Sequence, residues 1–394
     1  MKVNLFLAAA ALYLGGCGHV NQWQVHDRFD GVRSIYEANP AIDVLIVHGM
    51  GQAMEGPDGP HSGYSLPMQR EIVRGLTAAE RPPEIRTFPI LSNGVLLGTV
   101  VSTSYEDAPR ARKVTFYELS WAESVKPIKT ILLELEATRG YRETNPLEPR
   151  RARLNSLGKA FINTHLADPV IYSGSYGATL RNVVAEAVCI LTRRAPEPGK
   201  PCDFGSEAKT PVPIAIVTVS LGSALVFDAL NQLLAQGRNE AGAAIQVARA
   251  ASQMYMLANQ LPLMDLRALQ APAGKAWLDA YPCPSSGLEE SGGDLQQGLA
   301  GFLQLRRLPP GPEESGGPEI GPLAVTAFSD PNDLLTYFIS ERFKRHCKDV
   351  RFANVTVTNA ERVWLFLAAD PFVAHNGYVD NNRAIRLILD GGSP

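Results

Sequence analysis

The stretch from residue 213 to residue 230 limits the possible folds of this chain more than any other part of it. Residues 214–219 form a run of apolar, mostly β-branched side chains, which is typical of a strand buried on both faces. Apolar side chains then recur at helical spacing until Gly237, where we expect the helix to end. Ser220 therefore lies at a sharp turn from a buried strand into a helix, and the sequence predicts an α/β protein.

A serine at such a turn has the properties that a nucleophile needs. The turn holds the side chain above the sheet edge, and the first N–H groups of the helix point toward the same place. Gly222 fits because strand and helix pack closely there, whereas Thr218 stands where the pattern G-x-S-x-G has glycine. Thr218 must therefore be accommodated without closing the turn. The alternative is a buried strand whose helix is simply capped by Ser220.

A second buried strand, residues 42–47, runs directly into His48, Gly49 and Met50. A His-Gly strand with a serine turn far downstream resembles the α/β-hydrolase superfamily, in particular its lipases and esterases. The resemblance implies an α/β-hydrolase fold, with a mostly parallel central sheet flanked by helices, and an oxyanion hole made by the backbone N–H groups of Met50 and Leu221. Glycine suits this loop because a backbone N–H approaches a substrate only where side chains stay clear. We expect His48 to orient the loop rather than to act as a base.

Two further strands, expected at residues 323–329 and 352–358, are followed by a pair of aspartates and by His375, respectively. The order serine, aspartate, histidine is that of the α/β-hydrolases and differs from other serine-hydrolase orders. Of the seven histidines, His375 alone is expected in a loop after the last strand, flanked by small or polar residues. The resemblance implies that His375 is the general base for Ser220, and a solvated loop histidine is the alternative.

The catalytic acid has more than one candidate. Asp330 follows its strand immediately, and Asp333 lies one turn further on, before an aliphatic pair. Members of the resembled family commonly place the acid a few residues beyond the strand, so we favour Asp333 and keep Asp330 as the alternative acid. Asp330 then braces the turn through Asx-type hydrogen bonds. Asp370 is a third candidate, but it is too close in sequence to His375 to reach it comfortably.

Residues 122–212 and 284–322 have no counterpart in a minimal member of this superfamily. The first segment is expected to be largely helical, and forms either a lid above the site or a helical layer on the sheet. His165 shares a helical face with apolar residues, which favours a packing role. The second segment is rich in Gly, Pro and Ser, and is expected to be a long surface excursion around a helix at residues 295–308.

The N-terminus resembles the signal of a bacterial lipoprotein. Lys2 precedes an apolar stretch, residues 5–14, that is too short to span a bilayer. The tetrapeptide Leu-Gly-Gly-Cys that ends at Cys17 resembles a lipobox, which implies cleavage before Cys17, its lipidation, and a periplasm-facing protein tethered in the cell envelope. Position 18, directly after the cysteine, is Gly and not Asp. In a Gram-negative lipoprotein this would favour the outer membrane. An ordinary secretory signal with a chance cysteine is the alternative.

The length of 394 residues suffices for one large domain behind this signal. We assign the chain to a signal peptide at 1–16, a polar, turn-rich tether at 17–40, and an α/β-hydrolase domain at 41–394. The formal net charge of −3 and the lack of a long basic run give no sign of a nucleic-acid partner, and we expect none.

Four cysteines follow Cys17. In an oxidising compartment they permit two disulfides. Cys189 and Cys202 are the natural local pair because they close a short Pro-rich loop. Cys283 and Cys347 then form a second pair, and free buried thiols are the alternative.

Together these features predict a serine hydrolase that cleaves carboxylic esters, including lipid esters, through an acyl-serine intermediate. The predicted chemistry needs no metal or organic cofactor, and the sequence contains no P-loop and no zinc-like spacing of His, Cys and Asp. The same catalytic residues serve amidases, thioesterases and peptidases, which stay open as alternatives. A different alternative is a non-catalytic envelope lipoprotein that uses the scaffold for binding, which Thr218 and the insertion at 122–212 favour.

Overall fold

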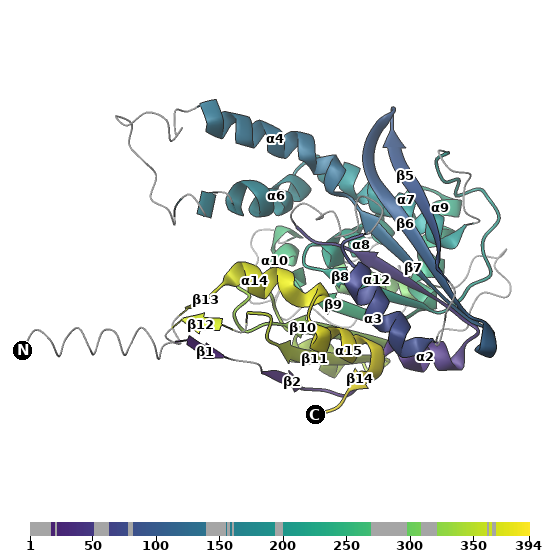
Figure 1. Ribbon diagram of the computed structural model, residues 1–394. Coiled ribbons are helices and arrows are strands. Elements are labelled where there is room, and N and C mark those ends of the chain that lie inside the picture. The colour runs from purple at the N-terminus through teal and green to yellow at the C-terminus, as the bar shows by residue number, and fades with distance from the viewer. Residues whose placement is uncertain are drawn as a thin grey trace, which may run out of the picture.

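The computed structural model describes residues 17–19, 22–50, 63–77, 82–138, 155, 158–159, 161–193, 200–268, 298–308, 321–360, 362–364 and 368–394. Helices cover both faces of a large sheet (Figure 1). Among the described residues, no helix is both long enough and apolar enough to cross a membrane. Because the sheet is covered by helices, the fold is of the mixed α/β class, as the sequence predicts.

Within the described part of the chain, the central sheet has nine strands in the order β2-β11-β10-β9-β8-β4-β7-β6-β5. The strands from β11 to β7 in this order run parallel to one another. β2 pairs antiparallel with β11, and β5 and β6 form an antiparallel hairpin beside β7. The mostly parallel sheet confirms the predicted sheet type. The strands are β2 (Trp23–Val25), β4 (Ala41–Val47), β5 (Glu84–Ser92), β6 (Val95–Asp107), β7 (Arg112–Ser120), β8 (Ile214–Val219), β9 (Ala251–Leu257), β10 (Leu323–Ser329) and β11 (Val350–Val357).

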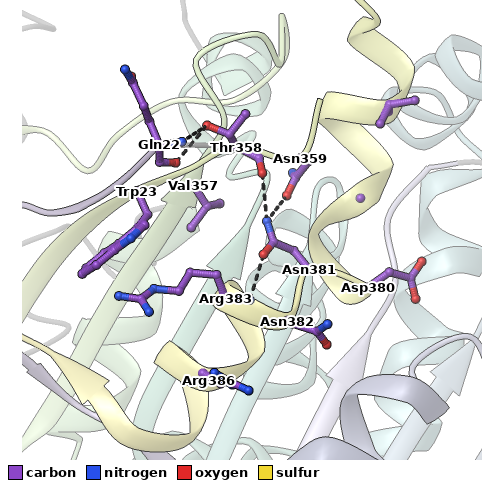
Figure 2. A pocket seen from close by; sticks show the side chains of 12 residues that line it. Gln22, Trp23, Val357, Thr358, Asn359, Asp380, Asn381, Asn382, Arg383 and Arg386 are labelled. Carbon is purple, nitrogen blue, oxygen red and sulfur yellow. Dashed lines mark hydrogen bonds between the residues drawn. The ribbon is translucent and has the colours of Figure 1, made fainter. Parts of the chain in front are cut away.

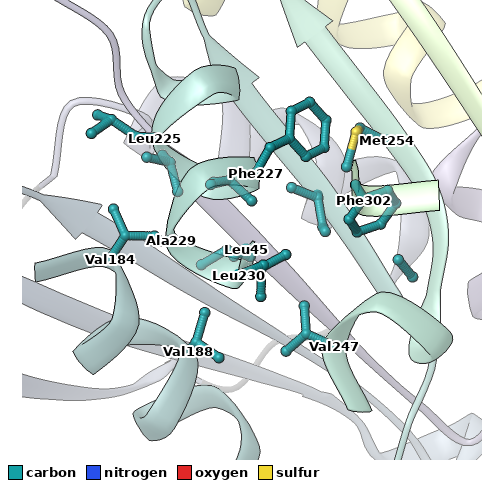
Figure 3. Packing of buried hydrophobic residues seen from close by; sticks show 14 of the residues in the cluster. Leu45, Val184, Val188, Leu225, Phe227, Ala229, Leu230, Val247, Met254 and Phe302 are labelled. Atoms are coloured by element: carbon teal, nitrogen blue, oxygen red, sulfur yellow. The ribbon is translucent and has the colours of Figure 1, made fainter. Parts of the chain in front are cut away.

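The central parallel strands are buried on both faces, as their uninterrupted apolar sequences predict. In β4, Leu45 and Val47 belong to one hydrophobic core, whereas Val44 and Ile46 belong to a second core. Successive side chains of a strand point to opposite faces, so the two cores lie on the two sides of the sheet. Figure 3 shows the first core, in which Leu45 lies next to Leu230.

A layer of helices closes each core. The core that contains Leu45 is covered by α7 (Gly177–Thr192), α8 (Gly222–Gln236), α9 (Arg238–Ala250) and α12 (Gly298–Arg307). The core that contains Val44 is covered by α2 (Val32–Ala38), α3 (Leu66–Leu76) and α15 (Asn382–Asp390). The remaining elements are β1 (Cys17–His19), β3 (Phe29–Asp30), η1 (Ala108–Arg110), α4 (Ala122–Thr138), η2 (Ile162–Leu166), α6 (Ala167–Ser173), α10 (Leu261–Asp265), η3 (Leu266–Ala268), α13 (Glu341–His346), β12 (Arg362–Trp364), β13 (Ala368–Ala369), α14 (Pro371–Asn376), η5 (Gly377–Val379) and β14 (Gly391–Gly392).

The predicted tether is folded from residue 22 onward. β2 adds to the edge of the sheet beside β11, and β3 pairs with β14 near the C-terminus. In α2, Val32 and Tyr36 are buried in the second core. The boundary expected at residue 40 therefore does not separate a free tether from the domain, because these residues complete a sheet edge and a helical layer. Residues 1–16, with the predicted signal, lie outside the described residues.

Among its described residues, the predicted insertion is largely helical up to residue 192, and these helices divide into two parts. α7 packs on the sheet as a helical layer, whereas α4 and α6 extend beyond the sheet (Figure 1). The prediction that residues 284–322 lie on the surface is wrong for the helix within them. The apolar side chains of this helix, α12, are buried against α8 and α9. The rest of that segment, apart from residues 308, 321 and 322, lies outside the described residues.

One predicted disulfide is confirmed. Cys189, in the last turn of α7, is bonded to Cys202 across 13 positions of the sequence. Cys347 is also disulfide-bonded, and Cys283, its predicted partner, lies outside the described residues.

Candidate active site

The turn between β8 and α8 has the geometry that the sequence predicts. Ser220 has a φ of 54°, in the left-handed region that residues other than glycine rarely adopt. Its N–H donates to the carbonyl oxygen of Leu257 at the end of β9 (2.7 Å), which fixes the turn against the neighbouring strand. A Cβ on Gly222 would lie 2.5 Å from the carbonyl oxygen of Val47, so only glycine allows this close approach of helix and strand.

Thr218 is accommodated by a hydrogen bond within the turn. Its Oγ1 lies 2.6 Å from the Oγ of Ser223, at the start of α8, and both side chains are fully buried. The hydroxyl pair satisfies two buried polar groups, and Thr218 also makes a longer hydrogen bond to the carbonyl oxygen of Tyr255 (3.5 Å). Thr218 therefore replaces the first glycine of the pattern without blocking the side chain of Ser220.

Ser220, His375 and Asp333 come together at the carboxyl ends of the parallel strands. The Nε2 atom of His375 lies 3.0 Å from the Oγ of Ser220, and its Nδ1 lies 2.9 Å from Oδ1 of Asp333. A carboxylate accepts hydrogen bonds, so Nδ1–H is the donor to Asp333 and Nε2 is free to accept the serine proton. All three side chains are buried, with exposed fractions of 2% for Ser220, 4% for His375 and 6% for Asp333. The structure thus joins the serine, histidine and favoured acid in one chain of hydrogen bonds.

His375 lies on a helix, which corrects the predicted loop. It is part of α14, which begins with Pro371 at its first position. Oδ1 of Asp370 accepts hydrogen bonds from the N–H groups of Phe372 (2.9 Å) and Val373 (3.3 Å). Asp370 is therefore the N-cap of the helix that presents His375, and is not the acid.

Asp330 braces the chain at the end of β10. Its Oδ1 accepts a hydrogen bond from the N–H of Asn332 (2.7 Å), and its Oδ2 accepts from the N–H groups of Asn359 and Ala360. These bonds form an Asx-type turn and tie it to the loop after β11. The carboxylate of Asp330 thus accepts from backbone donors, whereas Oδ1 of Asp333 accepts from His375 as well as from the N–H of Leu335 (3.0 Å).

Tyr378 is a site residue that the sequence analysis missed. Its side chain is fully buried; its hydroxyl donates to Oδ2 of Asp333 (3.1 Å) and accepts from the N–H of Asp330 (2.6 Å). Burial and the neighbouring carboxylates raise the pKa of Tyr378 well above its usual value, so the hydroxyl keeps its proton. Tyr378 therefore holds the oxygen of Asp333 that His375 does not use.

Replacing Tyr378 with phenylalanine is expected to lower kcat for ester hydrolysis about tenfold and to change KM little, because Asp333 loses a donor that fixes its orientation. The change also leaves the buried N–H of Asp330 without a partner, which costs about 1–3 kcal/mol of unfolding free energy. Steady-state kinetics and urea denaturation measure the two effects. Tyr64→Phe is the matched control, because the Tyr64 hydroxyl is buried without a hydrogen-bond partner in the described structure. An equal loss of kcat in both variants would contradict the role of Tyr378.

The loop after β4 is fixed by His48. Its Nδ1 donates to the carbonyl oxygen of Gly49 (2.8 Å), and its Nε2 accepts from the N–H of Trp121 (3.0 Å). The Trp121 ring stacks on the imidazole at 4.8 Å and donates from its indole N–H to the carbonyl oxygen of His48. One ring nitrogen donates and the other accepts, so His48 is the neutral imidazole. This confirms that His48 orients the loop, and burial lowers its pKa to about 4.

The same contacts define the surroundings of the two predicted oxyanion donors. With the Gly49 carbonyl held by His48, the trans peptide places the N–H of Met50 on the opposite side. A Cβ on Gly49 would lie 3.1 Å from the Oγ of Ser220, so this loop runs directly beside the serine. Within the described residues, neither the N–H of Met50 nor that of Leu221 has a hydrogen-bond acceptor.

Acidification is expected to destabilise the fold through His48. Its pKa is about 4 in the folded protein and about 6.5 when unfolded, so the unfolded chain takes up the proton first. The stability that depends on the neutral ring is complete above pH 6.5 and falls by roughly 3 kcal/mol as the pH falls toward 4. Urea denaturation at a series of pH values measures it. His48→Gln is expected to be less stable at pH 7 and to lack this share of the pH dependence; identical pH dependence in both proteins would rule the effect out.

Part of the insertion reaches the helix that carries His375. The ring of Phe161 packs edge-on against Phe372 at 4.6 Å, and His165 stacks on Phe161 at 5.3 Å. Burial, with further contributions from the charges of Lys129 and His375, lowers the pKa of His165. The insertion therefore both layers the sheet through α7 and contacts α14 through Phe161. His165 has the predicted packing role.

Within the described ranges, no group of three or more His, Cys, Asp or Glu side chains is arranged to hold a metal ion. No family model matches the sequence, and no curated protein matches it. Among solved structures, the chain is similar to acetyl xylan esterase 1 from Thermoanaerobacterium sp., at 7% sequence identity and a TM-score of 0.21 over 84% of this chain and 92% of that chain. A similarity of this size carries no argument about the fold or the chemistry, which rest on the geometry above.

Proposed function

We propose that this protein is a serine hydrolase that cleaves carboxylic esters through an acyl-serine intermediate. The observation that carries the proposal is the buried chain of two hydrogen bonds from Ser220 through His375 to Asp333. A serine hydroxyl is a weak nucleophile unless a neighbouring base accepts its proton. An imidazole fixed in the right tautomer by a carboxylate supplies such a base.

In the proposed reaction, Ser220 attacks the acyl carbonyl while Nε2 of His375 takes its proton. Asp333 holds the imidazole and stabilises its charged form, and the proton then passes to the leaving alcohol. The N–H groups of Leu221 and Met50 bind the oxyanion, each contributing about 3 kcal/mol to lowering the barrier. Water hydrolyses the acyl-serine with His375 as the base. No step in this scheme uses a metal or an organic cofactor.

An ester with an apolar acyl group fits the surroundings of the site. Leu334, directly after Asp333, is 76% exposed, and Phe161 of the insertion packs on Phe372 of α14. Exposed apolar side chains beside a polar site support binding of a hydrocarbon group. Amides, thioesters and peptides follow the same acyl-serine route, so the leaving group is decided by assay.

We also propose that the protein is a lipoprotein of the cell envelope, held through a lipid on Cys17. The backbone of Cys17 lies in β1, which pairs with β12, and β12 pairs with β13. β13 directly precedes α14, which carries His375. A lipid on Cys17 would therefore hold the site close to a membrane. Metabolic labelling with a clickable fatty acid, lost in Cys17→Ser, tests this part.

The test of the activity is labelling of the full-length protein in non-ionic detergent with a fluorophosphonate probe. The expected result is a single modified residue, Ser220, identified by mass spectrometry. Matched acetyl, butyryl and octanoyl nitrophenyl esters, a nitroanilide and a thioester then define the leaving group and chain length. A folded protein, checked by circular dichroism, that neither labels nor hydrolyses any of these would favour the non-catalytic alternative, for which the scaffold serves binding.

A further inference from the structure

A pocket of about 600 Å³ lies outside the candidate active site, where β2 and the loop after β11 meet the start of α15 (Figure 2). Val373 and Gly377 form one side of it. Positions 373 and 377 are four residues apart and share one face of the helical segment, whereas His375, two positions on from Val373, faces the other way. The pocket and Ser220 are therefore on opposite sides of α14. Its volume is that of a small-molecule site.

One wall of the pocket is held by a connected series of hydrogen bonds. Thr358 Oγ1 accepts from the N–H of Gln22 (3.2 Å) and donates to its carbonyl oxygen (2.8 Å). The Nδ2 of Asn381 donates to the carbonyl oxygen of Thr358 (3.2 Å) and to Oδ1 of Asn359 (2.7 Å), as Figure 2 shows. Nδ2 of Asn359 donates in turn to the carbonyl oxygen of Ala374 (2.7 Å). These amides hold the wall in one shape and tie it to α14.

The opposite side carries two arginines without anionic partners. Within the described residues, no hydrogen bond or ion pair is made by the guanidinium groups of Arg383 and Arg386, and the buried Nε of Arg383 has no acceptor. The Cζ of Arg383 lies 3.4 Å from the centre of the Trp23 ring, which fixes the guanidinium plane. Trp23 itself is 47% exposed. Asp380 also lines the pocket, so the local charge is two positive groups against one negative group.

We propose that this pocket binds the phosphate of a polyol phosphate ester. Two guanidinium groups present planar sets of N–H donors that match phosphate oxygens, and Arg383 is already held in place by Trp23. Asp380 and Asn382 are also among the residues that line the pocket, and carboxylate and amide groups pair with hydroxyl groups beside a phosphate. Such chemistry occurs in free glycerol phosphate and in the headgroup of an anionic glycerophospholipid.

The test uses full-length protein with Ser220→Ala, so that no ester is consumed, in non-ionic detergent. Three probes are titrated: inorganic phosphate, glycerol 3-phosphate and short-chain dihexanoyl phosphatidylglycerol, with dihexanoyl phosphatidylcholine as the control for acyl-chain binding. Binding is followed by tryptophan fluorescence and by the shift of the melting temperature. Trp23→Phe keeps an aromatic ring, so it is expected to retain the thermal shift and to lose the fluorescence change.

Arg383→Gln and Arg386→Gln are each expected to raise the Kd at least tenfold for the probe that binds best. Arg28→Gln is the matched control, because Arg28 is an exposed arginine that does not line the pocket, in the N-terminal segment that contains Trp23. Tighter binding of glycerol 3-phosphate identifies a free phosphate ester as the ligand, and tighter binding of phosphatidylglycerol identifies a lipid headgroup. Binding that is unchanged in both pocket variants, or no binding of either ester by protein whose melting is cooperative, overturns the proposal.

Discussion

Ser220→Ala is expected to lower kcat for ester hydrolysis by about 10⁴-fold or more and to abolish labelling by fluorophosphonates. The variant removes the only atom that the proposed mechanism allows to form the acyl intermediate, and what is left is binding by the oxyanion donors. The fold is expected to persist, because the variant removes only the hydrogen bond between Ser220 Oγ and His375. The turn itself is held by the backbone hydrogen bond from Ser220 to Leu257, which the variant keeps. Initial rates with a nitrophenyl ester and gel fluorescence measure the two effects.

The matched control for this variant is Ser223→Ala. Ser223 lies one turn further along, is equally buried, and bonds to Thr218 rather than to His375. Its loss leaves Thr218 with a weaker hydrogen bond, so about 1 kcal/mol of stability is expected to be lost while labelling persists. If Ser220→Ala still labels, or if Ser223→Ala loses activity as completely, another residue is the nucleophile.

His375→Ala belongs to the same prediction, because nucleophile and base act as one unit. Removing the base alone is expected to lower kcat nearly as much as removing the serine, and the double variant is expected to be no worse than either single one. His165→Ala is the control for the loss of an imidazole near α14, where it stacks on Phe161. Additive effects of the Ser220 and His375 changes would show that the two residues do not cooperate.

The residues that the sequence identifies are those whose local pattern fixes their place. A strand that is apolar at every position is buried on both faces, and the sharp turn after it at Ser220 follows from its junction with a helical pattern and from Gly222. The carboxyl ends of parallel strands meet at one edge of the sheet, so the segments after β4, β8, β10 and β11 converge. That is why the proximity of Ser220, Asp333 and His375, and of the loop after β4, was predictable without a structure.

The features that the sequence did not predict depend on tertiary contacts. Tyr378 holds Asp333 from a short turn whose place is set by packing of distant segments, and no spacing in the sequence signals such a contact. α14 has six residues, too few for a hydrophobic period, although Asp370 and Pro371 give a start signal. α12 lies between stretches rich in Gly, Pro and Ser, which hid its burial. β2 has three residues at a sheet edge, where one buried side chain, Val25, gives little pattern.

The choice between the two aspartates gives the other large expected effect. Asp333→Asn is expected to lower kcat by about 10⁴-fold. It is also expected to cost about 1–3 kcal/mol of stability, because the oxygen that the NH₂ replaces accepts a hydrogen bond from the N–H of Leu335 (3.0 Å). An amide NH₂ that faces Nδ1 of His375 makes Nδ1 a hydrogen-bond acceptor, so the ring proton moves to Nε2. A protonated Nε2 can no longer accept the proton of Ser220. The remaining bond from Tyr378 to the side-chain oxygen keeps the residue in position. Rates measured at saturating substrate, with denaturation curves, report both quantities.

Asp330→Asn is expected to lose a similar amount of stability and to keep most of its activity. Oδ1 and Oδ2 of Asp330 each accept from backbone N–H groups, and an amide can offer only one acceptor oxygen to them. Its NH₂ then faces either the N–H of Asn332 or those of Asn359 and Ala360, and the unpaired donors cost about 1–3 kcal/mol. kcat is expected to fall far less than in Asp333→Asn, because the bond between His375 and Asp333 is kept. A kcat loss of about 10⁴-fold in Asp330→Asn with unchanged stability would make Asp330 the acid. A residue that only braces the backbone is expected to change stability and to leave the tautomer of His375 as it is.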